Sequence, residues 1–236
     1  FVRHVPRRNP TVPMPPHALP TLETVTAALV THCRRGHLDH LDAAGRTFLS
    51  RRELSVFCAS GDAAYLSKRR LRATPLALGF RAPFFGGTIL PVAATHGHGW
   101  IARLMGVGVG YVISLPGEPS LYLSGDTVLT PEVRRVLDEE RPDVAVVHAG
   151  GAELDLGRSI LMTVDEVVGF ARLAQVIVIA TNLEALNHCP TTRADLRARL
   201  DAAELTAKVR IPADGDVVDC GCVPATKLLL LQSTTL

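Results

Sequence analysis

The chain has few aromatic residues and no long apolar run, and each shortage excludes a class of function. Phe, Trp and Tyr make up 5% of the 236 residues, too few for a surface that stacks the bases of single-stranded nucleic acid. No apolar stretch approaches the ~20 residues that cross a bilayer, and no signal peptide is recognisable. We therefore expect no nucleic-acid partner and no membrane, although a chain that begins at Phe1 leaves room for a segment upstream.

Cysteine pairs and several catalytic signatures are missing as well. The five cysteines are odd in number and irregularly spaced, so we expect no disulfide framework and a reducing compartment, the cytoplasm. The sequence contains no Ser-His-Asp pattern with a nucleophile elbow, no phosphate-binding P-loop and no dinucleotide fingerprint. The cysteines are Cys33, Cys58, Cys189, Cys220 and Cys222.

Positive charge is concentrated in the first third of the chain. The net charge is only +2, but residues 1–72 contain 12 Lys and Arg against 5 Asp and Glu. Such a basic region can attract an anionic substrate or a nucleic acid. Because the arginines are scattered, a solvated Arg-rich surface is the simpler interpretation.

Hydrophobic patterning predicts an α/β fold in one domain over residues 1–236. Residues 1–24 hold six prolines and are expected to form an extended lead-in. Apolar β-branched runs predict strands, and 3.6-residue periodicity with N-cap signals predicts helices. The expected strands are 25–32, 55–59, 86–96, a hairpin of 109–115 and 120–126, then 143–151, 176–182 and 208–216. The expected helices are 41–52, 61–71, 130–141, 163–174 and 191–205.

One pattern unites the expected strands, since most of them end in a polar side chain. In layered α/β proteins functional groups gather where strands end and loops begin. The sequence therefore predicts a site at one edge of the sheets. The residues at these strand ends are His32, His96, Asp126, His148 and Asn182.

The segment "THCRRGHLDH" (31–40) resembles a metal-binding loop. His37, Asp39 and His40 supply imidazole and carboxylate groups, which are common ligands of zinc, iron and manganese. A turn would direct all three side chains at one centre or at two adjacent centres. A polar turn rich in histidine explains the same segment without a metal.

Several motifs in one order resemble the metallo-β-lactamase superfamily, and within it the branch related to ascorbate-phosphate lactonases. The resemblance covers roughly residues 8–216 and implies a four-layer αββα sandwich. In that fold two sheets pack face to face, helices lie outside, and a metal site lies along one edge. The motifs are "RNPTVPMP", "TH…HLDH", "THGHGW", "LPGEPSLYLSGDTVLTPEV", "RPDVAVVHAGGA", "ATNLEALNHC", "LNHCPTTRADLR" and "IPADGD".

The resemblance also implies a set of ligands for one or two zinc ions, with manganese or iron(II) as alternatives. His32, His37 and His96 would hold the first ion, Asp39 and His40 the second, and Asp126 would bridge them. Asp39 and Asp126 are thus the expected catalytic residues. In the family a metal-bound or bridging hydroxide attacks an ester, lactone, amide or phosphoester.

The sequence departs from the family pattern in three places. The usual loop reads H-x-H-x-D-H, whereas "CRRG" separates His32 from His37. Either this loop bulges and His32 still reaches the metal, or Arg35 takes the first ligand's place. Asn182 stands where relatives carry a histidine, which predicts a weaker second site unless His188 substitutes. The family's opening strands are also missing, and an exposed sheet edge would favour a homo-oligomer.

We therefore expect a metal-dependent hydrolase that cleaves an ester, lactone or phosphoester of a small anionic substrate. The alternative is a degenerate, metal-poor member that acts as a non-catalytic binding or scaffold protein. Near the site, His148 is a candidate proton shuttle. His98 is expected only to form hydrogen bonds beside the site, and Trp100 to pack in the core. Glu184 and Asp214 are expected to orient neighbouring groups.

Overall fold

A mixed seven-stranded sheet forms the larger half of the structure, a computed structural model that describes residues 16, 18–33, 41–154, 158–184 and 189–220. β12, β11, β8 and β7 are mutually parallel, and β6, β5 and β4 continue the sheet as antiparallel neighbours. The strands in spatial order are β12 (Val209–Arg210), β11 (Ile177–Thr181), β8 (Val144–His148), β7 (Leu121–Leu123), β6 (Val107–Ser114), β5 (Gly87–Thr95) and β4 (Ala82–Phe84).

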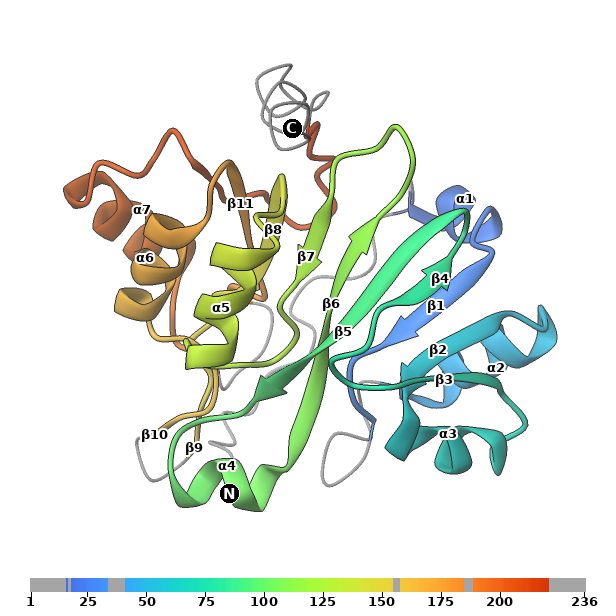
Figure 1. Cartoon of the computed structure of the whole chain (residues 1–236). Coiled ribbons are helices and arrows are strands. Elements are labelled where there is room, and N and C mark those ends of the chain that lie inside the picture. Colours follow the sequence, from blue (N-terminus) through green and yellow to red (C-terminus); the bar gives the residue numbers. More distant parts are fainter. Residues whose placement is uncertain (1–15, 17, 34–40, 155–157, 185–188, 221–236) are drawn as a thin grey trace, which may run out of the picture.

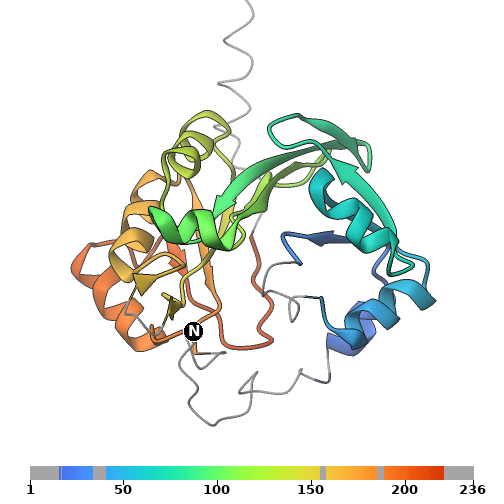
Figure 2. The same ribbon diagram turned by 90° about the horizontal axis from the view of Figure 1, so that it is seen from below.

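A smaller parallel sheet of three strands faces the larger one (Figures 1 and 2). Its strands are β1 (Ala27–Val30), β2 (Ser55–Ala59) and β3 (Arg72–Leu76). Parallel neighbours need crossover connections, which α2 (Ala43–Arg51) and α3 (Ser60–Ser67) provide on the outer face of this sheet.

Three helices cover the outer face of the larger sheet (Figure 2). They are α5 (Pro131–Glu139), α6 (Val164–Leu173) and α7 (Arg193–Ala202), and each begins after a threonine whose side chain accepts a backbone N–H. The predicted capping box of Thr163 and Glu166 at the start of α6 is confirmed. Shorter elements complete the described fold: α1 (Ala18–Glu23), α4 (Trp100–Met105), β9 (Glu153–Leu154) and β10 (Arg158–Ser159).

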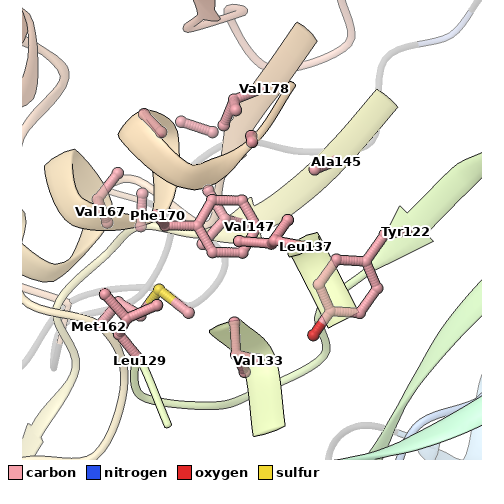
Figure 3. Close-up of a cluster of buried hydrophobic side chains, with 14 of the residues drawn as sticks. Tyr122, Leu129, Val133, Leu137, Ala145, Val147, Met162, Val167, Phe170 and Val178 are labelled. Atoms are coloured by element: carbon pink, nitrogen blue, oxygen red, sulfur yellow. The ribbon is translucent and has the colours of Figure 1, made fainter. Parts of the chain in front are cut away.

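Three apolar clusters fill the three interfaces between these layers. The largest packs α5, α6 and α7 against the larger sheet through residues such as Leu137, Val147 and Phe170 (Figure 3). A second lies between the smaller sheet and helices α2 and α3. The third lies between the two sheets and includes Ile89 and Tyr111. Helix, sheet, sheet and helix therefore stack as the predicted four-layer αββα sandwich.

The expected elements are present, and the structure differs from the prediction at helix ends, at sheet edges and by the additional helix α4. The lead-in predicted as extended over 1–24 contains a helix at Ala18–Glu23, because Pro20 falls in its first turn, where proline removes no helical hydrogen bond. β3 and β4 were not predicted. They carry Pro75 and Pro83 and are both edge strands, where proline is tolerated. Among the described helices, none has the length and apolar character that spanning a bilayer requires.

Two hydrogen bonds join the smaller sheet to the larger one at the end of β1. The buried Tyr111 hydroxyl on β6 donates to the Val30 carbonyl at 2.6 Å. The Val109 N–H, also on β6, donates to the Thr31 carbonyl at 2.8 Å. These bonds fix the position of the chain immediately before His32.

Replacing Tyr111 with Phe should therefore destabilise the protein by about 1–2 kcal/mol, because the Val30 carbonyl loses a buried donor. Tyr122→Phe is the matched control: its hydroxyl is fully buried in the helix-facing cluster (Figure 3) and has no hydrogen-bond partner among the described residues. Removal of that hydroxyl should be neutral or stabilising. Urea unfolding of both variants measures the difference, and equal losses would contradict the assignment of the inter-sheet bond.

Candidate metal centre

Three strands deliver a polar side chain to the same edge of the sandwich. His32 follows β1 of the smaller sheet, and His96 and Asp126 follow β5 and β7 of the larger one. β5 and β7 run in the same direction in the sheet, so their carboxyl ends meet at one edge (Figure 1). The three side chains are almost inaccessible to solvent, at 7%, 1% and 6% exposure in this order.

Their ligand atoms converge at the spacing that a bound ion requires. The Nε2 atoms of His32 and His96 each lie 3.5 Å from Oδ2 of Asp126, and the three ligand atoms are within 4.8 Å of one another. Tetrahedral ligands about 2.1 Å from a zinc ion are about 3.4 Å apart. Two imidazole nitrogens and a carboxylate oxygen at this spacing fit a first-row divalent ion.

A threonine hydroxyl contacts the ring of His32, which also lies close to the ring of His96. The Thr31 hydroxyl lies 3.0 Å from His32 Nδ1, which leaves Nε2 directed at Asp126. The ring centroids of His32 and His96 are 4.9 Å apart with an interplanar angle of 72°. Donation from Nδ1 to the Thr31 hydroxyl would favour the tautomer in which Nε2 offers a lone pair to a metal.

Two hydrogen bonds join the loop that carries His96 to the loop that carries Asp126. The Thr95 N–H donates to the Thr127 hydroxyl at 3.1 Å, and the Val128 N–H donates to the Thr95 carbonyl at 3.0 Å. Gly125 has φ +65°, and a Cβ there would lie 2.7 Å from the Val109 carbonyl oxygen. Glycine is therefore required directly before Asp126.

His148, at the end of β8, binds the carboxylate of Asp126 from the other side. Its Nδ1–H donates to Asp126 Oδ1, while Oδ2 faces His32 and His96. Burial alone would raise the pKa of Asp126. The hydrogen bonds from His148 and His96, together with the charges of His148 and His32, outweigh burial and hold that pKa well below its usual range. Asp126 is therefore an anion at neutral pH, as a metal ligand must be.

Asn182 lies at the same edge, one strand further along. Its predecessor Thr181 pairs with His148 in the parallel register of β11 and β8. Asn182 is half-buried and has φ +61°, a conformation that asparagine adopts more readily than most residues. The positive φ thus explains an asparagine at this position without a metal. The role of Asn182 as a metal ligand stays a prediction.

The remaining predicted ligands, His37, Asp39 and His40, lie outside the described residues, as do Arg35 and His188. Of the seven predicted ligands, the structure thus brings together His32, His96 and Asp126. Because His32 lies in this cluster, the interpretation in which His32 reaches the site despite the "CRRG" insertion fits the geometry. Whether each residue binds metal stays a prediction.

A cavity of about 540 Å³ opens beside His32 and His96. Its wall includes two charged residues that the sequence did not single out, Asp62 on α3 and Arg103 on α4. Asp62 follows closely after β2, so the rule of polar residues at strand ends could have identified it. Arg103 lies in a helix that was not predicted, and no pattern in the sequence marks it.

Other residues near the edge have structural contacts of their own. The exposed His98 contacts Glu166 Oε1 through Nε2 at 3.2 Å, in agreement with its expected hydrogen-bonding role. Glu184 and Asp214 both bind Arg193, at 2.7 and 2.6 Å, and so orient the start of α7 as expected. The expectation that Trp100 packs in the core is wrong, because this residue is 52% exposed on α4.

Sequence comparisons place the chain among metal-dependent hydrolases. Residues 3–181 match the family described as the β-lactamase superfamily domain. The UPF0173 protein YddR of Bacillus subtilis is 28% identical over 211 residues, which cover 88% of this chain and 81% of that protein. A UPF0173 metal-dependent hydrolase of Methanoculleus marisnigri is 33% identical over 143 residues, 58% of each chain.

Solved structures with a similar fold also include hydrolases. The isothiocyanate hydrolase from Delia radicum gut bacteria is 28% identical, with a TM-score of 0.77 over 89% of this chain and 81% of that one. A protein of Veillonella parvula described as a possible metal-dependent hydrolase is 27% identical, with a TM-score of 0.77 over 89% and 82%. Named metal-dependent hydrolases therefore occur among both relatives and structural neighbours, and the predicted enzyme class is confirmed at this level.

The contact between His148 and Asp126 predicts a supporting role that metal titration can measure. His148→Ala should weaken zinc binding about 10- to 100-fold, the usual effect of removing a group that orients a ligand. His98→Ala is the matched control, because His98 contacts Glu166 and not Asp126. Competition with a chromogenic chelator gives both affinities. Equal zinc affinity in His148→Ala and the wild type would show that the contact does not support the centre.

Proposed function

Since this chain belongs to the metallo-β-lactamase superfamily, we propose that it hydrolyses an ester, lactone or phosphoester of a small anionic molecule at the centre formed by His32, His96 and Asp126. The observation that carries this proposal is the meeting of two imidazole nitrogens and one carboxylate oxygen within 4.8 Å of one another. They come from separate strands, and His32 and His96 line a cavity large enough for a small molecule.

Each residue of the centre has a distinct task in this proposal. His32 and His96 would hold an ion through Nε2, and Asp126 through Oδ2, while the hydrogen bond from His148 keeps the carboxylate in place. An ion bound there, zinc or alternatively manganese or iron(II), supplies Lewis acidity and an activated water for attack on the substrate. The buried position of the three ligands excludes competing solvent from the reacting groups.

One relative suggests a second substrate class. One solved structure that is 28% identical to this chain is described as an isothiocyanate hydrolase. An isothiocyanate is therefore a second candidate substrate and belongs in the same screen as esters, lactones and phosphoesters. A closer relation to ascorbate-phosphate lactonases, a cytoplasmic location and a homo-oligomer stay predictions.

Substitution of Asp126 tests the proposed function. Asp126→Ala should lose at least one equivalent of zinc per chain and all hydrolysis, because the centre loses its anion. Asp138→Ala, on the exposed side of α5, is the matched control and should keep both. Metal content by mass spectrometry and initial rates over the substrate panel are the measurements, with circular dichroism to confirm folding. A wild type that takes up neither zinc nor manganese would favour the alternative of a metal-poor scaffold.

Asn182 tests the second metal position. Asn182→His should tighten binding of a second equivalent of zinc by about tenfold, because imidazole is a better zinc ligand than an amide oxygen. Histidine also tolerates the positive φ of this position. Isothermal titration with zinc gives the stoichiometry and both affinities. An unchanged second affinity would place residue 182 outside the coordination sphere.

A further inference from the structure

Helix α4 forms much of the cavity wall beside the candidate metal centre. Six of the eleven described residues that line the cavity lie between Ala102 and Gly108, in α4 and the start of β6, while His32 and His96 belong to the candidate metal centre. The helix lies at the lower edge in Figure 1, in the connection from β5 to β6. Any substrate that reaches the centre through this cavity therefore contacts α4.

The position of α4 is fixed by one buried residue and by one glycine. Ile101 is 2% exposed and packs with Ile160 and Leu161 beneath the loops of the site. A Cβ on Gly97 would lie 2.8 Å from the Ile101 side chain, and Gly97 itself has φ +64°. A side chain at residue 97 would thus displace the helix. Met105 packs against the same cluster, so α4 is held against the fold while Arg103 stays exposed.

Arg103 is the only Lys or Arg that lines this cavity among the described residues. Four other arginines of the described chain, including Arg81 and Arg193, pair with a carboxylate within 4.0 Å, but no described carboxylate pairs with Arg103. Within the part of the chain that the structure describes, Asp62 is the one carboxylate that lines the cavity beyond the metal centre, and it is buried, whereas Arg103 is exposed. Arg103 is therefore the solvent-accessible charge of the described cavity wall, and Asp62 is the buried one.

The rest of the α4 wall is apolar. Ala102, Met105 and Val107 line the cavity around Arg103. A guanidinium group in such surroundings binds an oxyanion through two parallel N–H donors. A single positive charge matches the single negative charge of a carboxylate better than the double charge of a phosphate monoester.

We propose that Arg103 is a specificity residue that binds a carboxylate of the substrate, separated by an apolar spacer from the bond cleaved at the metal centre. The inference rests on the proposed function, because it names the substrate class of that same centre. The preferred substrate is then an ester or lactone with a remote carboxylate.

Binding of unreactive acids tests this inference without turnover. Succinate, adipate and suberate would each place one carboxylate at the zinc-loaded centre and offer the second to Arg103. Butyrate, hexanoate and octanoate, of the same chain lengths, offer only the first. Isothermal titration should show at least one dicarboxylate binding on the order of 10- to 100-fold tighter than its monocarboxylate partner. Equal affinities at all three lengths would overturn the proposal.

Variants assign that preference to Arg103. Arg103→Gln should remove it without changing the affinity for the monocarboxylate, and Arg103→Lys should retain part of it. Arg134→Gln, an exposed arginine on α5 that does not line the cavity, is the matched control and should keep it in full. A preference that survives in Arg103→Gln, or that Arg134→Gln also loses, would contradict the assignment.

The two proposals fail separately. If the wild type hydrolyses no compound of the substrate panel but prefers dicarboxylates through Arg103, the hydrolase is wrong and the carboxylate site stands. If esters are hydrolysed and no length shows the preference, the hydrolase stands and the role of Arg103 is wrong.

Discussion

The hydrogen bonds between the end of β1 and the middle of β6 are the constraint on which the candidate centre depends. His32 comes from the smaller sheet, whereas His96 and Asp126 come from the larger one. Tyr111 and the backbone of Val109 attach the chain at Val30 and Thr31 to β6, immediately before His32. Apolar packing between the sheets is not directional, so these two bonds set how far β1 reaches toward the site.

The electrostatics of the centre follow from the same arrangement. Burial of a carboxylate is costly unless cations or donors surround it. Asp126 meets this condition through histidines on three sides, which come from three different strands. The described wall of the cavity adds two further charges, the buried Asp62 and the exposed Arg103. The edge of the sandwich is thus polar, although its interior is apolar.

The sequence predicts most of the fold, because periodicity and caps are local signals. The capping box at Thr163 and the strands that precede His32, His96 and Asp126 are of this kind. Edge strands β3 and β4 were missed because proline argues against a strand unless the edge position is known. The place of Arg103 in the cavity wall and the hydrogen bond from Tyr111 to Val30 depend on contacts between distant segments. No local sequence pattern contains such contacts.

The origin of the ligands in both sheets has a consequence for folding. An ion held by His32, His96 and Asp126 would cross-link the two halves of the sandwich, and the unfolded chain has no such site. Its binding free energy would then add to the cohesion between the sheets, by an amount that grows with the logarithm of the free ion concentration. The free energy needed to separate the two sheets would thus depend on the concentration of metal ions in the surroundings.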